Sequence, residues 1–212
     1  MLARLTLGCV LAGSLLLSAC AEDTSVDPPP APEAEPIEEE APEEAPEASA
    51  LIRPLDDSGV EGLITFQTTN GGVQVTYALA GLTPGAHGFH VHENGDCDPG
   101  DDGTPGGAAG GHFAPQEDPH GAPSAEAGQR HVGDFGNIEA GADGRASGTF
   151  VDALIAFEGD NSIIDRAVVV HAEADDLESQ PSGNAGARVG CGVVRSMASM
   201  QQNLPPGHPP IN

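Results

Sequence analysis

The sequence of 212 residues contains no lysine, and its seven basic residues are all arginines. These face 33 acidic residues, so the formal net charge at pH 7 is -26. A nucleic-acid-binding protein needs basic side chains to neutralise phosphates. The charge balance therefore excludes nucleic acid as a partner.

Aromatic residues are also scarce, at 3% of the chain, whereas glycine occurs 29 times. This composition disfavours a large helical core and favours a turn-rich β fold. Residues 60–66 and 73–79 alternate apolar and polar side chains around Asn70-Gly71-Gly72, which is typical of a β-hairpin. Further short strands are expected at 88–92, 133–139, 146–151, 166–171 and 191–195. We therefore predict that the body, residues 50–199, is all-β: an eight-stranded, immunoglobulin-like Greek-key β-sandwich or flattened barrel with long metal-binding and active-site loops.

The N-terminal segment, residues 1–19, has the features of an export signal. It begins with Arg4, continues through an apolar run from Leu5 to Leu17, and ends in small residues. The run is too short for a membrane-spanning helix and predicts a signal peptide. Its end, Leu-Ser-Ala-Cys20, is similar to a bacterial lipobox, which implies a lipid on the Cys20 sulfur. The lipid would anchor the protein to a bacterial membrane, facing the periplasm or the cell exterior; a plain secretory signal is the alternative.

Residues 20–49 are rich in Pro, Glu and Ala and contain eleven acidic side chains. With so few large apolar residues, nothing offsets the entropy cost of ordering this segment. Prolines and like charges favour an extended chain, so we predict a disordered acidic tether. A specific acidic binding motif is the alternative. The C-terminal tail, residues 200–212, is predicted to be flexible.

Two of the four cysteines, Cys97 and Cys191, lie in the body. In an exported protein, two such cysteines most simply form one disulfide. The bond would close a loop of roughly 95 residues, worth on the order of 4–5 kcal/mol in the chain-entropy model. Two buried free thiols are the alternative.

The stretch from 85 to 134 contains six of the eight histidines. In a strand, the side chains of His90 and His92 leave the same face, and two imidazoles so placed suit copper or zinc. His87, three residues before His90, faces the other way and is interpreted as structural. A Gly- and Pro-rich segment follows and predicts loops that fold back over the strand. These loops carry a typical zinc ligand set of imidazoles and one carboxylate: His112, His120, His131 and Asp134.

Six blocks of the sequence stand out together: GFHVHENGDC, AGGHFAP, HGAP, RHVGDFGN, VVVHAEADDL and GNAGARVGCGVV. In this order, and with the ligand residues in place, they resemble the signature of the copper–zinc superoxide dismutase family. The resemblance runs from about Leu51 to about Arg195. It implies an enzyme that converts superoxide to oxygen and hydrogen peroxide by alternate reduction and reoxidation of a histidine-bound copper, in antioxidant defence of the cell envelope.

The resemblance also implies a ligand set for the two cofactors. Copper would be held by His90, His92, His112 and His171. Zinc would be held by His112, His120, His131 and Asp134. His112 would then lie between the metals as an imidazolate, because only a second cation makes the loss of both ring protons easy. Copper has two accessible oxidation states, whereas zinc has one and shapes the site.

Two further residues receive roles from the resemblance. Asp175 matches a carboxylate that hydrogen-bonds one copper histidine and one zinc histidine, for which we expect His90 and His120. Arg188 matches the arginine that positions the anion beside copper, and its guanidinium cannot lose its charge. The alternative is plain surface charge for both Asp175 and Arg188. With Arg188, His112 is expected to be catalytic, because it can cycle a proton.

The chain departs from many family members in having no lysine to steer superoxide. Glu173 and Pro181 occupy places where a cation is often found. The body carries six arginines and 22 acidic residues, a net charge near -16. Superoxide should be repelled at long range, although Arg188 and the metals attract it locally. We therefore expect a rate below that of the fastest members, which added salt lowers only weakly or even raises.

Two other functions are compatible with the sequence. One is a copper- or zinc-binding protein without turnover, and the other is an adhesive or structural module on the cell surface. Metal storage needs neither an anion guide nor a bridging histidine, so Arg188, His112 and Asp175 favour the enzyme. The ligand set argues against a purely structural module. The oligomeric state stays open, with a homodimer as one alternative.

Overall fold

The computed structural model describes residues 46–202, which form nine strands and two short helices. The first strands are β1 (Ala48–Pro54), β2 (Glu61–Thr69), β3 (Gly72–Ala80) and β4 (Gly85–His92). After the 3-10 helix η1 (Gly107–Ala109) come β5 (Asp134–Ala140), β6 (Ala146–Asp152) and β7 (Ala167–His171). The chain then forms β8 (Arg188–Val193), β9 (Arg195–Ser196) and the helix α1 (Met197–Gln202).

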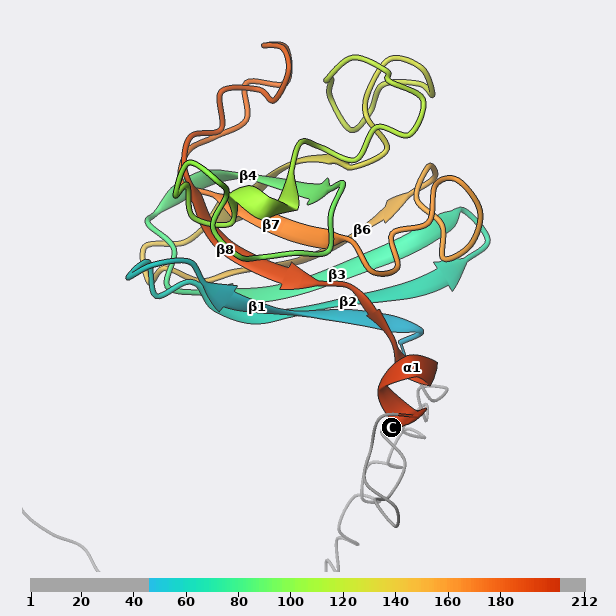
Figure 1. The fold of residues 1–212 in the computed structure, drawn as a ribbon, viewed down its shortest axis with the longest axis horizontal. Coiled ribbons are helices and arrows are strands. Elements are labelled where there is room, and N and C mark those ends of the chain that lie inside the picture. The colour runs from blue at the N-terminus through green and yellow to red at the C-terminus, as the bar shows by residue number, and fades with distance from the viewer. Residues whose placement is uncertain (1–45, 203–212) are drawn as a thin grey trace, which may run out of the picture. The chain divides into compact units, whose positions relative to one another are not determined.

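Eight principal strands follow one another in the order β5-β4-β7-β8-β1-β2-β3-β6, and every neighbouring pair is antiparallel. β1 joins the two layers because its first part pairs with β2 and its end, Arg53 and Pro54, pairs with β8. The two edge strands, β5 and β6, lie beside each other and leave only one seam open. The predicted all-β fold is thus confirmed as a nearly closed antiparallel barrel (Figure 1).

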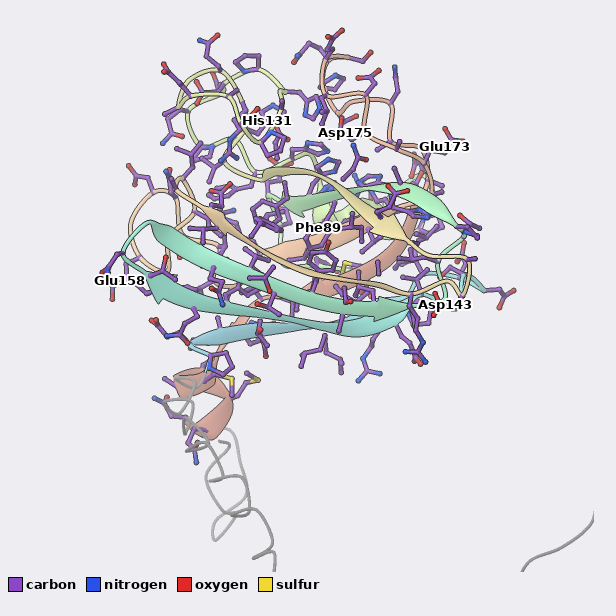
Figure 2. The ribbon with its side chains drawn as sticks, turned by 180° about the vertical axis from the view of Figure 1, so that it is seen from behind. Phe89, His131, Asp143, Glu158, Glu173 and Asp175 are labelled. Atoms are coloured by element: carbon purple, nitrogen blue, oxygen red, sulfur yellow. A yellow bond between two sulfur atoms is a disulfide. The ribbon has the colours of Figure 1, made fainter. Side chains whose placement is uncertain are left out.

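The core lies between the two layers of strands. In β2, Ile64 and Phe66 are fully buried, while their neighbours point outward, as period-2 alternation requires. Phe89 of β4 lies between the layers in Figure 2, with tilted ring contacts to Tyr77 and Phe135 at centroid distances of 5.8 and 5.5 Å. Burying such side chains contributes about 1.5–3 kcal/mol each, so this core supplies the rigid support on which the loops are built.

The boundaries differ from the expectations at both ends of the body. β1 was not among the strands expected from the sequence, and its first residues, Ala48 and Ser49, fall in the segment assigned to the tether. Their small side chains give little periodic signal, and the strand is defined by pairing with β2. At the other end, α1 extends past Met200 into the predicted flexible tail. Among residues 46–202, no helix is both long and apolar enough to cross a membrane. The predicted signal peptide and Cys20 lie outside the described residues.

Two long loops rise on the same side of the barrel, away from α1 (Figure 1). The first, residues 93–133, connects β4 to β5, and the second, residues 172–187, connects β7 to β8. Cys97 of the first loop is bonded to Cys191 of β8, with a Cα–Cα distance of 5.8 Å. The disulfide therefore fixes the beginning of the first loop to the strand that follows the second.

Candidate metal centre

Two strands supply the first three predicted ligands. His90 and His92 lie in β4, and His171 is the last residue of the neighbouring strand β7, where the β7–β8 register shifts. All three side chains are buried. His87 is also buried, and its ring nitrogens lie 2.8 Å from the carbonyl oxygen of His171 and 2.7 Å from that of Thr83. His87 therefore holds the backbone of a predicted ligand, in agreement with the structural role expected for it.

The first loop is attached to β4 by backbone hydrogen bonds. Phe113 N–H donates to the carbonyl of Val91 (2.9 Å), Val91 N–H donates to that of Gly133 (2.9 Å), and Gly133 N–H donates to that of Phe113 (3.0 Å). A Cβ on Gly133 would lie 2.2 Å from the Val91 oxygen, so glycine is required for this approach. The arrangement places His112 directly beside His92, with which it forms an isolated β-bridge.

One cluster gathers around the carboxylate of Asp134 at the start of β5. Its Oδ1 atom lies 2.7 Å from His112 Nδ1, 3.0 Å from His120 Nδ1 and 3.1 Å from His131 Nδ1. The other carboxylate oxygen accepts backbone hydrogen bonds from Gly121 (3.0 Å) and His131 (2.9 Å). Three imidazole nitrogens and one fixed carboxylate thus converge on a single point, as the predicted zinc ligand set requires.

The second cluster lies on the other side of the His112 ring. Ligand atoms of four buried histidines lie within 4.8 Å of one another: His90, His92, His112 and His171. His92 Nε2 and His171 Nε2 are 3.4 Å apart. His112 belongs to both clusters, because its Nδ1 faces Asp134 while its Nε2 has no hydrogen-bond partner in the described chain. The shared histidine predicted from the resemblance therefore lies between the two groups.

The unpaired atoms test whether these residues fit metal ions. His90 Nδ1 and His112 Nε2 are buried and have no hydrogen-bond partner among the described residues. The other nitrogen of each ring is hydrogen-bonded to a carboxylate: His90 Nε2 lies 2.8 Å from Asp175, and His112 Nδ1 lies 2.7 Å from Asp134. Leaving a buried polar atom unpaired costs about 1–3 kcal/mol, a penalty that metal coordination would remove. The donor set fits copper on one side and zinc on the other.

The protonation states of the metal-free clusters follow from burial and charge. Burial disfavours the imidazolium form and lowers the pKa of His112 to about 4 and that of His171 to about 3. Burial acts on His120 in the same direction, but the carboxylates of Asp134 and Asp175 outweigh it and raise its pKa to about 9. Burial would raise the pKa of Asp134, yet hydrogen bonds from the surrounding histidines hold it well below its usual value. The rings of His112 and His171 in the copper-side cluster are thus neutral at pH 7 and able to bind a cation.

Asp175, in the second loop, joins the two clusters. Its Oδ2 lies 2.8 Å from His90 Nε2, and its Oδ1 lies 2.9 Å from His120 Nε2, the two histidines expected for it. The side chain of Asn137 bonds both the N–H and the C=O of Asp175, at 2.7 and 2.8 Å. A Cβ at Gly183, whose φ is +64°, would lie 1.8 Å from Asp175 Oδ1. The approach of Asp175 therefore depends on a glycine.

Arg188 lies at the mouth of the copper-side cluster. Its two Nη atoms donate to the carbonyl oxygens of Gly106 and Gly110, both at 2.5 Å. Together with His92, His112, His131 and His171, it lines a cavity of about 500 Å³. These carbonyl groups belong to the first loop, which the disulfide fixes to β8. Arg188 is therefore held at the cavity wall both by its own strand, β8, and by the first loop.

Several residues that position the site were missed by sequence reasoning. Asn137 and Gly183 lie inside the recognised blocks, but their roles depend on contacts across the fold. Gln180 bonds both backbone groups of His120, at 2.8 Å each, from 60 residues away. Arg130, next to His131, is buried and bonds Asp152 of β6. Arg130 is the first residue of the block RHVGDFGN, but its role was missed because neither the block nor periodicity shows what a loop side chain contacts.

Comparisons with known proteins agree with this geometry. Residues 60–194 match the family model described as copper/zinc superoxide dismutase (SODC). The extracellular superoxide dismutase [Cu-Zn] of Brugia pahangi is 45% identical over 148 residues, which cover 66% of this chain and 71% of that protein. Match and geometry coincide, since the matched range contains both histidine clusters, Asp175, Arg188 and the disulfide. The chain therefore belongs to the copper/zinc superoxide dismutase family.

Proposed function

We propose that this chain dismutates superoxide to oxygen and hydrogen peroxide at the paired clusters, with the predicted residues as ligands and catalytic groups. The observation that carries the proposal is the sharing of one buried histidine, His112, by two four-residue clusters beside Arg188. Copper bound at His90, His92, His112 and His171 would supply the alternating one-electron chemistry, and zinc at the other cluster would hold the geometry.

The roles of the protein groups follow from their positions. Arg188 is a fixed cation in the wall of the cavity, so it attracts and orients a small anion there. His112 Nε2 has no hydrogen-bond partner among the described residues, so it is available to hold copper, and it can carry a proton only while it is not bound to the metal. Asp175 fixes the orientation of His90 and His120 through their Nε2 atoms.

Superoxide dismutation by the purified chain, loaded with copper and zinc, tests the proposal. Replacement of His112 by Ala should remove activity and lower the content of both metals. Arg188→Ala should retain both metals and lose roughly 10–100-fold in rate, as expected for one charge-assisted contact. Arg195→Ala is the matched control, because Arg195 is an exposed arginine of β9. Full metal occupancy with negligible turnover in the unmodified chain would contradict the enzyme and favour a metal-holding protein.

The cellular role goes beyond the catalytic site. We propose an exported, lipid-tethered form that protects the cell envelope from superoxide. A disulfide in the barrel supports an oxidising compartment, and the Brugia relative is named extracellular. The signal peptide, the lipid on Cys20 and the acidic tether remain predictions. Metabolic labelling with a palmitate analogue, with Cys20→Ser as the control, tests the anchor.

A homodimer is the assembly that the surface favours. Among the described residues, Leu51 of β1 and Leu63 of β2 are large exposed apolar side chains, 54% and 46% exposed, and they are directly paired across the strands. Arg53, Glu61 and Arg145 line a cavity of about 480 Å³ that includes Leu51. A two-fold interface could set Arg53 of one copy against Glu61 of the other. Light scattering should show a dimer that Leu63→Glu converts to a monomer; a wild-type monomer would contradict this assembly.

A further inference from the structure

Arg130 is the most deeply buried arginine of the described chain, with 2% of its surface exposed. Its Nη1 atom donates to the backbone oxygens of His131 (3.1 Å), Val132 (3.4 Å) and Asp134 (3.2 Å). Its Nη2 atom donates to Asp152 Oδ2 at 2.5 Å. One guanidinium therefore bonds three carbonyls of residues 131–134, the zinc-side turn, which carries two predicted zinc ligands.

Asp152 is fixed independently of Arg130. It is the last residue of β6 and is 4% exposed. Its Oδ1 accepts backbone hydrogen bonds from Leu154 (2.8 Å) and Ile155 (3.1 Å), so the carboxylate is held by the end of a strand. Asp134 begins β5, the strand on the other side of the open seam. The Arg130–Asp152 pair thus crosses the seam of the barrel where the zinc-side turn starts.

Few hydrogen bonds join the two predicted zinc ligands of the turn to each other, while Gly133 between them is bonded to Val91 and Phe113. His131 N–H donates to Asp134 Oδ2 (2.9 Å), and Asp134 N–H donates to the His131 carbonyl at a longer 3.3 Å. The carbonyls of the turn point to Arg130, while the side chains of His131 and Asp134 point to the predicted zinc position. We propose that the Arg130–Asp152 pair is a positioning device that sets the zinc affinity of the centre. The inference rests on the proposed zinc ligands.

The chemistry of arginine suits this position. A guanidinium has five donors in a planar fork, which can reach a carboxylate and several carbonyls at once. A lysine ammonium keeps the charge but is a compact group that cannot span the same acceptors. Removing one partner of a buried ion pair leaves the other uncompensated. Arg130→Lys should therefore weaken zinc binding less than Arg130→Met, and neither should reproduce the wild type.

The test measures zinc affinity of the full chain by competition with a chromophoric chelator, and the visible spectrum of cobalt(II) bound in place of zinc. We expect Arg130→Met to raise the zinc dissociation constant about 10–100-fold, the usual cost of losing a group that orients a ligand. The cobalt spectrum should change as well, because the ligand geometry relaxes. The electron paramagnetic resonance of copper(II) at the other cluster should change less than the cobalt spectrum, since the hydrogen bonds of Arg130 go to His131, Val132, Asp134 and Asp152 and to none of the copper-side histidines.

Two variants separate positioning from general effects. Arg195→Met removes an arginine of an exposed ion pair and controls for the lost charge. Val75→Ala truncates a fully buried side chain of β3 and controls for lost stability. Zinc affinity and cobalt spectra like the wild type in both Arg130 variants would overturn the inference, as would an equal shift in Val75→Ala. If Arg130→Met does not fold, Arg130→Lys decides. A wild-type chain that takes up no zinc would instead refute the proposed zinc site.

Discussion

The two halves of the metal centre are built differently. His90, His92 and His171 lie on neighbouring strands, whose hydrogen-bonded ladder fixes their positions. His120 and His131 lie in a long loop, where position depends on Asp134, on Asp175 and on backbone contacts. His112 belongs to both halves. The strand-borne half is therefore placed by the core of the barrel, and the loop-borne half by polar contacts that must all form together.

Because of this difference, we expect the strand-borne half to tolerate substitutions better than the loop-borne half. A change in one loop contact can shift several groups at once, because Asp134 Oδ1 is shared by three imidazoles. The strands are supported by many backbone hydrogen bonds, so a single lost side chain affects mainly its own position. The four predictions that follow test this contrast.

Removing one histidine from each half should give the largest effects. We expect His90→Ala to lose copper and to fall to the activity of the metal-free chain, while it retains zinc. His131→Ala should lose zinc but retain copper, because its ring belongs only to the loop-borne cluster. Metal analysis of the purified variants, beside activity, checks both. Loss of both metals in both variants would show that the two halves are not separable.

The sequence predicted the strand-borne half more directly than the loop-borne half. The period of two in β4 places His90 and His92 on one face without any knowledge of the fold. His120 and Asp175 are 55 residues apart, and only a resemblance to the family suggested that they meet. The hairpin of β2 and β3 was readable from alternation and an Asn-Gly-Gly turn, whereas β1 was not among the predicted strands, because the small residues at its start carry little pattern. Contacts such as Gln180 with His120 depend on loop geometry and leave no local signal.

Stability of the metal-free chain should depend on pH in opposite ways for the two halves. The pKa of His171 is about 3 in the fold against 6.5 in an unfolded chain, so the fold binds fewer protons below pH 6.5. The stability that His171 contributes is therefore complete above pH 6.5 and is lost as the pH falls. From this residue, the free energy of unfolding should fall by about 3 kcal/mol by pH 4. His120, with its pKa raised to about 9, stabilises the fold fully below pH 6.5 and loses this as the pH rises through 9.

Urea denaturation of the metal-free chain between pH 4 and pH 10 measures both effects. His171→Gln should remove only its own part of the acid-side loss, because the pKa of His112 is also lowered, to about 4, and His112 contributes a loss of similar size. His120→Gln should remove the alkaline-side loss. Saturating copper and zinc should flatten the profile, because the ligands are then held deprotonated. An acid-side loss that persists unchanged in His171→Gln would show that other groups cause it.

Gly183→Ala should break a contact that joins the halves. The added Cβ would lie 1.8 Å from Asp175 Oδ1 and 2.7 Å from His120 Nε2, so Asp175 must move away. We expect zinc affinity to fall about 10–100-fold, with a smaller effect on copper. Gly159→Ala is a matched control, since φ at Gly159 is +75° and nothing lies within 4 Å of an added Cβ. Equal losses in the two variants would assign the effect to backbone strain alone.

The smallest effect should come from salt. Arg188 of β8 attracts superoxide at short range, whereas the exposed second loop carries Glu173, Asp176 and Glu178, with Glu173 at its outer side in Figure 2. Exposed charges farther apart than about 8–10 Å are screened at physiological salt, while the partly buried Arg188 is screened less. Raising the ionic strength from about 0.01 to about 0.3 M should therefore remove more repulsion than attraction and change the rate less than about twofold, with either a weak fall or a rise. Glu173→Gln should raise the rate at low salt and reduce any increase of the rate with ionic strength. A steep fall of the rate with salt would mean that Arg188 and the metals control the approach of the anion despite the net charge of the body.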